Sequence, residues 1–415
     1  MSGFPRLARI RQTVPTAPLA EVAQTVREEL RRIGVPACVT PGARIAVAAG
    51  SRGITDYAVI VRTVVEELQR WGAAPFVFPA MGSHGGATAD GQRTVLAELG
   101  ITAETIGCPV HSAMQVVQVG TTARGLPVFC DAAAYASDGI ILVNRVKVHT
   151  DFHGPTESGL TKMLAIGLGK RQGAEAIHAH GVQGLRHDLP EVAAVQLAHS
   201  PILCGVAIVE DGAHHVSQIQ AIPAQQIAQV EPLLLDQARQ LTARLPVSAC
   251  DLLIVEQMGK EISGAGMDNN VIGRMYIDGE LEPATPQIEL IIVLRLSAAS
   301  HGNATGIGFA DLVTQQLIDA MDPEITCINI ATSGFPRRGR IPPVLPTDQV
   351  AIAHALATLA QRGRIDPTVL RITNTLQLAD VQVSKNLLPE LSTRTGIRLL
   401  AAPQELCFRA DGSLI

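Results

Sequence analysis

The chain is predicted to be an α/β protein with two doubly wound domains and a cleft between them. Three observations support this prediction: short apolar runs alternate with helical patterns, several of these runs lead into glycine-rich loops, and the alternation restarts after a break at Pro246. Strands that alternate with helices of this length are typical of βαβ units on a parallel sheet. The 415 residues also exceed the usual size of a single core. We therefore expect one domain over residues 1–246 and a second over residues 247–415.

The first half contains the clearest strand and helix patterns. In chain order we expect a strand at Arg44–Ala49, a turn at 50–53, a helix with Ile60, Val64 and Leu68 on one face that ends near Gly72, a strand at Phe76–Pro79, a glycine-rich loop at 82–88, a helix that ends at Gly100 and a buried strand at Gly139–Val143. Each glycine-rich segment follows a strand, as expected for the loops of a parallel α/β sheet.

The second half repeats this alternation. A long helix over 224–244 is followed by Pro246, then by strands at Asp251–Val255 and Ile288–Leu296. The loop after the second of these strands shares Ser-His-Gly-x-Ala-Thr with the loop at 82–88. Either both halves follow one Rossmann-like plan, with the two loops facing a shared cleft, or two glycine-rich turns resemble each other by chance.

Composition excludes several classes of protein. The hydrophobic fraction of 47% predicts a sizeable core, whereas 3% aromatic residues and a net charge of −5 disfavour a nucleic-acid partner. The apolar runs are too short for a membrane span, and the first residues lack the apolar core of a signal peptide. Seven cysteines without a CxxC pair fit reduced thiols better than disulfides, so we expect a cytoplasmic location.

Ionisable side chains concentrate between residues 144 and 181, directly after the predicted strand at Gly139–Val143. His149, His153, Lys162, His178 and His180 lie there among glycines. Ligands of α/β proteins gather in loops at the carboxyl ends of such strands. A purely structural network needs fewer histidines, so this segment is predicted to be the centre of an active site.

Each candidate also has a simpler explanation. His84, between glycines at the end of a strand, suits proton transfer, but it is equally typical of a histidine that hydrogen-bonds to its own turn. His149 and His153 could each act as a base, a metal ligand or a hydrogen-bond donor to phosphate. The simpler explanation is that both lie in a solvated polar loop. Lys162 has three possible roles: it could hold an anion together with helix N–H groups, act as a desolvated nucleophile, or extend from a helix end to solvent. The spacing of a P-loop is absent.

Other candidates are less specific. His178 and His180 are two residues apart, so on a helix their rings would diverge, and only one of them suits a metal held mostly by other groups. Arg52, in the first predicted turn, suits a bidentate contact with a carboxylate or phosphate. In the second half, Lys260 and the run 263–274, which includes Asn270, offer further polar groups. The basic loop 335–340 is interpreted as solvated surface in preference to an anion lid.

Taken together, the order and spacing of these residues resemble the nickel-dependent lactate racemase family, as a divergent branch. The resemblance covers most of the chain. It rests on the turn Ser51-Arg52, the loop Gly82-Ser83-His84 with Thr88, the segment from His149 to Lys162, His178 sixteen residues further on, and the glycine-rich run His301–Phe309. Members of this family carry a nickel-pincer nucleotide covalently attached to a lysine.

The resemblance implies an isomerase, a racemase or epimerase of a small 2-hydroxy acid, acting by proton-coupled hydride transfer. It implies that His84 and His149 are the catalytic pair and that Lys162 carries the cofactor, pyridinium-3-thioamide-5-thiocarboxylic acid mononucleotide nickel. His178 would ligate the nickel, and Ser158 and Gly159 would contact the cofactor. Residues 1–246 would form the catalytic, cofactor-tethering domain, and residues 247–415 would close the cleft.

The chain also departs from the family pattern. The interval from His149 to Lys162 is three residues longer than in the lactate enzymes, which leaves His153 as an alternative second base. Ala49 replaces an aspartate, and the run 263–274 is unlike the segment that holds the substrate carboxylate. A different 2-hydroxy acid is therefore expected. By their positions in the sequence, the expected substrate-binding residues are Arg52, Lys260, Asn270 and His301.

Two further functions remain open at this stage. One is a sugar-acid epimerase or isomerase with the same cofactor, and the other is a non-enzymatic protein that binds an anion or nucleotide. The expected partners are a small 2-hydroxy acid and the enzymes that synthesise the cofactor. The sequence gives no prediction of the oligomeric state.

Overall fold

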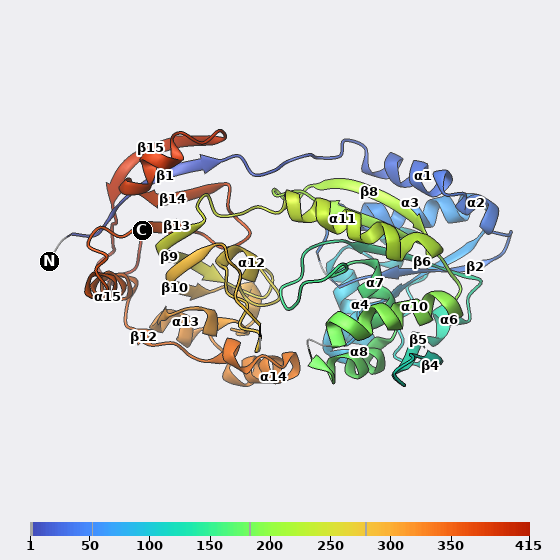
Figure 1. Ribbon diagram of the computed structural model, residues 1–415. Helices are drawn as coiled ribbons and strands as arrows, with labels where there is room; N and C mark the ends of the chain where they lie inside the picture. The colour runs from blue at the N-terminus through green and yellow to red at the C-terminus, as the bar shows by residue number, and fades with distance from the viewer. Residues whose placement is uncertain (1–2, 52, 182–183, 279) are drawn as a thin grey trace. The chain divides into compact units, whose positions relative to one another are not determined.

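The computed structural model describes residues 3–51, 53–181, 184–278 and 280–415 (Figure 1). The chain divides into two compact units: one is Pro15–Thr242, and the other combines the residues up to Val14 with Ala243–Ile415. The sequence analysis assigned the first fourteen residues to the N-terminal domain. Instead, strand β1 (Arg6–Gln12) pairs antiparallel with two strands of the C-terminal segment, which satisfy its backbone groups on both sides.

The Pro15–Thr242 unit contains a five-stranded sheet in the order β3-β2-β6-β7-β8. Its strands are β2 (Arg44–Ala49), β3 (Ala74–Pro79), β6 (Gly139–Arg145), β7 (Ile202–Glu210) and β8 (Val216–Pro223). The first four strands in the order are parallel, and β8 is antiparallel to β7. The strands predicted at 44–49, 76–79 and 139–143 are thus confirmed. A separate hairpin consists of β4 (Val116–Thr121) and β5 (Pro127–Asp131).

Helices cover both faces of this sheet, because its strands are apolar on both faces. One core contains Val47 and the other contains Ala48, as the alternation of side chains along a strand requires. The first core includes helices α1 (Val22–Arg32), α3 (Tyr57–Arg70), α4 (Ala89–Glu98) and α5 (Ala103–Ile106). The second includes α7 (Leu160–Lys162), the π-helical turn η2 (Met163–Gly167), α8 (Lys170–His178), α10 (Leu189–His199) and α11 (Ile227–Leu241).

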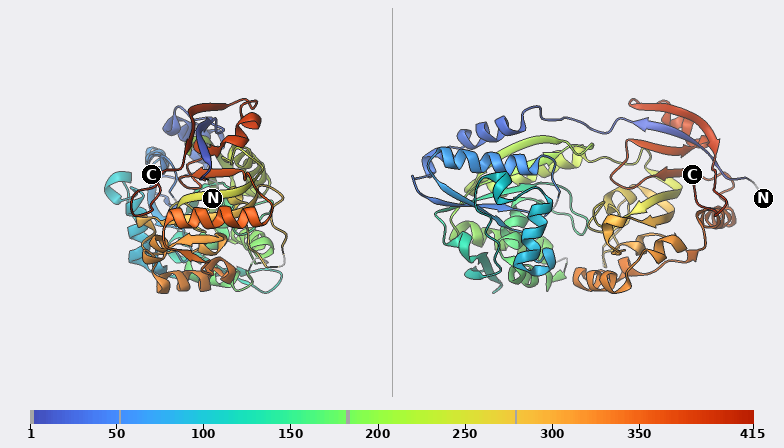
Figure 2. Two further views of the ribbon diagram at one scale, coloured as in Figure 1. Left: turned by 90° about the vertical axis from the view of Figure 1, so that its left-hand side faces the viewer. Right: turned by 180° about the vertical axis from the view of Figure 1, so that it is seen from behind.

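Shorter elements complete this unit. They are α2 (Val35–Cys38), α6 (Ala132–Tyr135), the π-helical turn η3 (Gly184–Asp188) and the 3-10 turns η1 (Gly85–Ala87) and η4 (Ala224–Gln226). The long helix predicted over 224–244 therefore consists of η4 followed by α11. Two views of the whole chain show its helices and strands from the side and from behind (Figure 2).

The other unit contains an eight-stranded sheet in the order β12-β11-β10-β9-β13-β14-β1-β15. Besides β1, its strands are β9 (Ala249–Met258), β10 (Gln287–Leu296), β11 (Leu312–Thr314), β12 (Val344–Leu345), β13 (Val369–Ile372), β14 (Asp380–Ser384) and β15 (Ile397–Glu405). The strands from β12 to β13 in this order are parallel, whereas β14, β1 and β15 are antiparallel.

The helices of this unit are α12 (Asn269–Ile272), α13 (Gln315–Asp319), α14 (Pro323–Ser333), α15 (Asp348–Gln361) and α16 (Leu388–Leu391). Helix α15 packs its apolar side chains against β9 and β10. The loop with the second Ser-His-Gly-x-Ala-Thr connects the 3-10 turns η5 (Ala298–Ser300) and η6 (Ile307–Phe309), and strand β11 follows.

The α/β class predicted from the sequence is confirmed by these parallel sheets and their helices. Within the described residues, no helix has both the length and the apolar character that a membrane span requires. All seven cysteines are free thiols: Cys108, Cys130, Cys204 and Cys250 are buried, and the other three are exposed.

Candidate active site

Three segments with candidate side chains meet at one edge of the five-stranded sheet. Strands β3, β2 and β6 are parallel neighbours, so their carboxyl ends lie along the same edge. Ser51 follows β2, His84 follows β3, and His149 follows β6. In the sheet, β3 lies on one side of β2 and β6 lies on the other side. The order of the strands therefore reverses between β2 and β6, which makes this position a topological switch point. Ligands of open α/β sheets bind at such points.

The His84 loop is held by its own backbone and by Gln92 of α4. Gly82 and Gly85 have φ values of 60° and 63°, a region that favours glycine. The Gln92 side-chain amide donates to the carbonyl oxygens of Gly82, at 2.8 Å, and of His84, at 3.2 Å. On the imidazole, Nδ1 forms a hydrogen bond with Ser51 Oγ. The serine therefore fixes the ring orientation of His84, and with it the nitrogen presented at the opposite edge of the ring.

The loop after β6 is organised around the buried carboxylate of Glu157. This carboxylate accepts hydrogen bonds from the backbone N–H of His149 at 2.6 Å, from the Arg239 guanidinium at 2.7 Å and from His153 Nδ1 at 3.2 Å. Burial on its own would raise the pKa of Glu157, but these donors outweigh it and lower the pKa. Glu157 is therefore ionised at neutral pH and holds the loop in place.

His149, and not His153, contacts the candidate tethering lysine. The backbone N–H of Asp151 donates to His149 Nδ1 at 2.9 Å, and His149 Nε2 forms a hydrogen bond with Lys162 Nζ. The His149 side chain is 11% exposed, whereas that of His153 is 44% exposed and contacts Glu157. The imidazole of His149 also packs against the Phe152 ring, at 4.7 Å between centroids. Both contacts fix the plane of the His149 ring.

Lys162 lies in the first turn of the helical segment α7–η2, as the sequence predicted. Asn144, at the end of β6, donates to the Gly159 carbonyl at 2.8 Å and so connects this turn to the sheet. The buried Glu231 carboxylate accepts from Thr161 N at 2.9 Å and from Thr161 Oγ1. A carboxylate of the chain thus occupies this helix start. This disfavours the interpretation of Lys162 as part of an anion site with these N–H groups. The other two interpretations, a nucleophile and a lysine that reaches solvent from a helix end, are not distinguished by this contact.

His178 is the last residue of α8 and lies within electrostatic reach of Lys162. The His178 side chain reaches solvent, yet surrounding protein groups desolvate its ring. This desolvation, and secondly the charge of Lys162, lower its pKa, while Asp151 acts in the opposite direction. The ring is therefore neutral at pH 7, as a metal ligand must be. His180 instead contacts Asp188, with 2.6 Å between Nδ1 and Oδ2.

No cluster of three or more His, Cys, Asp or Glu side chains suited to a metal ion occurs in the described part of the chain. The neutral imidazole of His178 is of a type that can serve as a single protein ligand to a metal.

Part of the chain is similar to a known family of proteins. Residues 6–187 match the family model of the lactate racemase N-terminal domain, a range that includes Ser51, His84, His149, Lys162 and His178. Over this range the chain is similar to the lactate racemases. The fold agrees: a solved structure of the lactate racemase apoprotein from Thermoanaerobacterium thermosaccharolyticum superposes with a TM-score of 0.51, at 12% identity, covering 87% of this chain and 93% of that chain. No curated protein matches the chain.

The predicted substrate-binding residues lie in the unit with Ala243–Ile415, or outside the described residues. Lys260 Nζ donates to the Gly264 carbonyl at 2.6 Å and to Asn329 Oδ1 at 2.8 Å. Asn270 donates through its side-chain amide to Asp268 at 3.1 Å. His301 is exposed, with a left-handed φ of 47°. The prediction for Arg52 concerns a residue outside the described ranges.

One interpretation of the sequence is wrong. The basic loop 335–340 was assigned to solvated surface, but Arg338 is buried. Its guanidinium donates to the Met275 carbonyl at 2.8 Å and stacks on Phe335, with 3.8 Å between Cζ and the ring centroid. Arginine is weakly hydrated and planar, so aromatic rings can cover it where they would not cover a lysine. Arg340 of the same loop is exposed.

Several residues that shape the site were missed by the sequence analysis. They are Glu157, Glu231, Arg239 and Gln92, whose side chains hold the His149 loop, the α7 turn and the His84 loop. A usable signal existed for Glu231: it is a carboxylate in the otherwise amphipathic helix α11, on the side that packs in the core. No local pattern identifies the other three.

Proposed function

We propose that this protein is a racemase or epimerase of a small 2-hydroxy acid, with a nickel-pincer nucleotide covalently attached to Lys162. The observation that carries the proposal is the contact of His149 Nε2 with Lys162 Nζ, with His178 within electrostatic reach of the same amine. A candidate base and a candidate tether from two segments are thus in contact, and the candidate metal ligand from a third segment interacts electrostatically with the tether. The match to the lactate racemase N-terminal domain supports the same assignment.

The residues fit the roles that racemisation requires. Inversion at the carbon that bears the hydroxyl group requires a base for the hydroxyl proton of each enantiomer. His84 and His149 suit this pair, since each imidazole can act as base in one direction and as acid in the other. The Ser51 hydroxyl and the Asp151 backbone N–H hold the two rings at Nδ1. When bound, the nucleotide would supply the hydride acceptor.

Other residues are assigned supporting roles in this proposal. His178 would ligate the nickel, and Ser158 and Gly159 would contact the nucleotide beside Lys162. Arg52, Lys260, Asn270 and His301 would bind the substrate. Each of the two units would be a Rossmann-like domain.

Intact-mass spectrometry tests the tether. The chain would be produced together with the cofactor-biosynthesis enzymes, as wild type, Lys162→Ala and Lys385→Ala, where Lys385 is an exposed lysine of the other unit. Wild type and Lys385→Ala should gain the same mass and bind nickel, and Lys162→Ala should gain none. His178→Ala should keep the organic part of the added mass and retain less nickel by elemental analysis. An equal gain in Lys162→Ala would contradict the tether.

Chiral product analysis tests the reaction. Single enantiomers of small 2-hydroxy acids would be incubated with loaded protein, and the opposite enantiomer measured by chiral chromatography. His84→Ala should keep the cofactor mass and lose turnover. If only sugar acids are turned over, the substrate class is sugar acids and not small 2-hydroxy acids. If the loaded protein binds anions but turns over neither class of substrate, the result would favour a non-enzymatic binding protein.

A further inference from the structure

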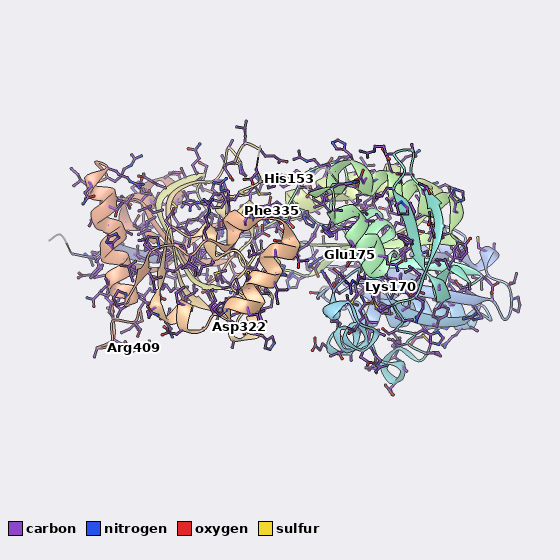
Figure 3. The ribbon with its side chains drawn as sticks, turned by 90° about the horizontal axis from the view of Figure 1, so that it is seen from below. His153, Lys170, Glu175, Asp322, Phe335 and Arg409 are labelled. Atoms are coloured by element: carbon purple, nitrogen blue, oxygen red, sulfur yellow. The ribbon has the colours of Figure 1, made fainter. Side chains whose placement is uncertain are left out.

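A second lysine lies beneath the site and is completely buried. Lys170, the first residue of α8, has 0% exposed side chain, and Figure 3 labels it together with Glu175 of the same helix. Its ammonium donates to the Pro79 carbonyl at 2.5 Å and to Gln92 Oε1 at 3.2 Å, and it lies 3.3 Å from Asp131 Oδ2. Lysine is rarely buried unless it is paired, so these contacts need an explanation.

The contacts of Lys170 lead to the His84 loop. Pro79 is the last residue of β3, directly before that loop. Gln92, which accepts from Lys170, donates to the carbonyl oxygens of Gly82 and His84. The ammonium therefore orients the Gln92 amide: its oxygen is turned toward Lys170, so its NH2 group is turned toward the loop.

The same loop packs directly on the segment that carries Lys162. A Cβ at Gly82 would lie 2.8 Å from the Ile166 side chain, and a Cβ at Gly167 would lie 2.6 Å from the Ala80 carbonyl. Both glycines thus permit a close approach that larger residues would prevent. Lys162, the turn η2 and Lys170 follow one another in the chain, so Lys170 anchors the far end of the segment that begins with Lys162.

The backbone of Lys170 also carries strain that the surroundings maintain. Its φ is 52°, in a region that non-glycine residues rarely adopt. Its partner Asp131 caps α6 by accepting from Ala133 N at 2.9 Å and Ala134 N at 3.0 Å. A buried ion pair is a poor source of stability compared with apolar packing. Strained residues held in this way are frequent at functional sites.

We propose that Lys170 is a positioning residue of the active site: through Gln92 and the Pro79 carbonyl, it fixes the His84 loop against the helical segment that carries Lys162. The inference depends on the proposed function only where it assigns His84 and Lys162 to one reaction. The positional claim concerns the protein without cofactor and is tested there.

Histidine NMR of the cofactor-free protein gives the decisive measurement. Imidazole signals of His84, His149 and His178 would be followed from pH 5 to 9 in wild type, Gln92→Met and Gln69→Met. Gln69 is a matched control, because its amide donates to the Gly107 carbonyl at 2.9 Å in an exposed part of the same unit. Gln92→Met should shift the titration midpoint of His84 and broaden its signal, while His149 and His178 keep theirs. Gln69→Met should change none of the three.

A second variant tests the lysine itself. Lys170→Met combined with Asp131→Asn removes both charges, so that neither is left buried without its partner. It should reproduce the His84 shift, and if it does not fold, Gln92→Met still decides. An unchanged His84 in Gln92→Met, or equal changes in all three histidines, would overturn the proposal. In loaded enzyme, Gln92→Met should lower kcat by up to about 10²-fold with KM retained, as expected for a misplaced catalytic group.

These measurements separate the two proposals. The NMR titrations require neither cofactor nor substrate, so a protein without racemase activity can still show the predicted His84 shift. Conversely, an active racemase with an unaffected His84 in Gln92→Met would refute the positioning role alone.

Discussion

The backbone N–H of His149 donates a hydrogen bond of 2.6 Å to the buried carboxylate of Glu157. This contact closes the loop that brings His149 Nε2 to the Lys162 amine. Arg239 of α11 supplies the balancing charge for the carboxylate at 2.7 Å. The geometry of a candidate catalytic histidine is therefore set by an ion pair whose members lie 82 positions apart in the sequence.

Removal of the arginine from this pair is expected to destabilise the Pro15–Thr242 unit. Arg239→Met leaves Glu157 buried without its cation, and the expected loss is about 2 kcal/mol in the free energy of unfolding at pH 7. Arg171→Met is the matched control, since Arg171 pairs with Glu175 on the exposed surface of α8 and should have almost no effect. Urea unfolding measures both. Equal effects of the two substitutions would contradict the role assigned to Arg239.

The stability of the protein should depend on pH through Glu157. Its folded-state pKa is lowered, so it contributes stability that is present above the pKa of an unfolded glutamate, about 4.3, and is lost as the pH falls through the lower folded value. Glu157→Gln removes this dependence. Between pH 6 and pH 3, the unfolding free energies of wild type and variant should converge as the pH falls. Parallel curves would show that Glu157 has no lowered pKa.

Gly159 is expected to tolerate no side chain. A Cβ there would lie 1.8 Å from Glu231 Oε1, a buried atom that cannot move into solvent. Gly159→Ala should therefore cost about 1–3 kcal/mol in the free energy of unfolding. Gly154→Ala is the control, because the nearest atom to its Cβ would be the Thr156 carbonyl at 3.5 Å. Thermal or urea unfolding of the two variants measures the difference. An unchanged free energy of unfolding in Gly159→Ala would contradict the close packing of Gly159 against Glu231.

Loss of the Ser51 hydroxyl should affect turnover more than stability. Ser51→Ala removes the hydrogen bond at His84 Nδ1, and a bond worth about 1 kcal/mol corresponds to roughly fivefold in kcat of the loaded enzyme. Ser137→Ala is the control, because this serine donates to the Ala134 carbonyl at 2.6 Å, next to the start of β6 at the opposite edge of the sheet. An unchanged kcat in Ser51→Ala would exclude a role for the serine in orienting His84.

Arg338 of the other unit should not be replaceable by lysine. Arg338→Lys loses the planar contact with Phe335 and the paired donors to the Met275 carbonyl, with an expected cost of about 2 kcal/mol. Arg340→Lys changes an exposed residue of the same loop and should leave the unfolding free energy nearly unchanged. If both variants unfold at the same urea concentration, Arg338 is not the structural residue described here.

Local patterns in the sequence were sufficient to predict the strands and helices that carry the candidate site residues. The strand at Arg44–Ala49 was predicted to the residue, and Lys162 was placed in a helix start, because apolar runs and glycines report on the backbone around them. The same patterns singled out His84, His149 and His178 as residues that require an explanation. They also predicted the α/β class, which depends only on the alternation of strands and helices.

The partners of these residues were decided by tertiary structure alone. Glu231 meets Thr161 across 70 positions, and β1 pairs with β14 near the other end of the chain, which moved the first residues into the second unit. Burial reversed one local expectation, since Arg338 was assigned to solvated surface, and it also encloses Lys170, for which no prediction was made. The physical reason is the same in each case: a buried polar group is stable only when distant segments bring it a partner, and no spacing along the chain encodes which segment arrives.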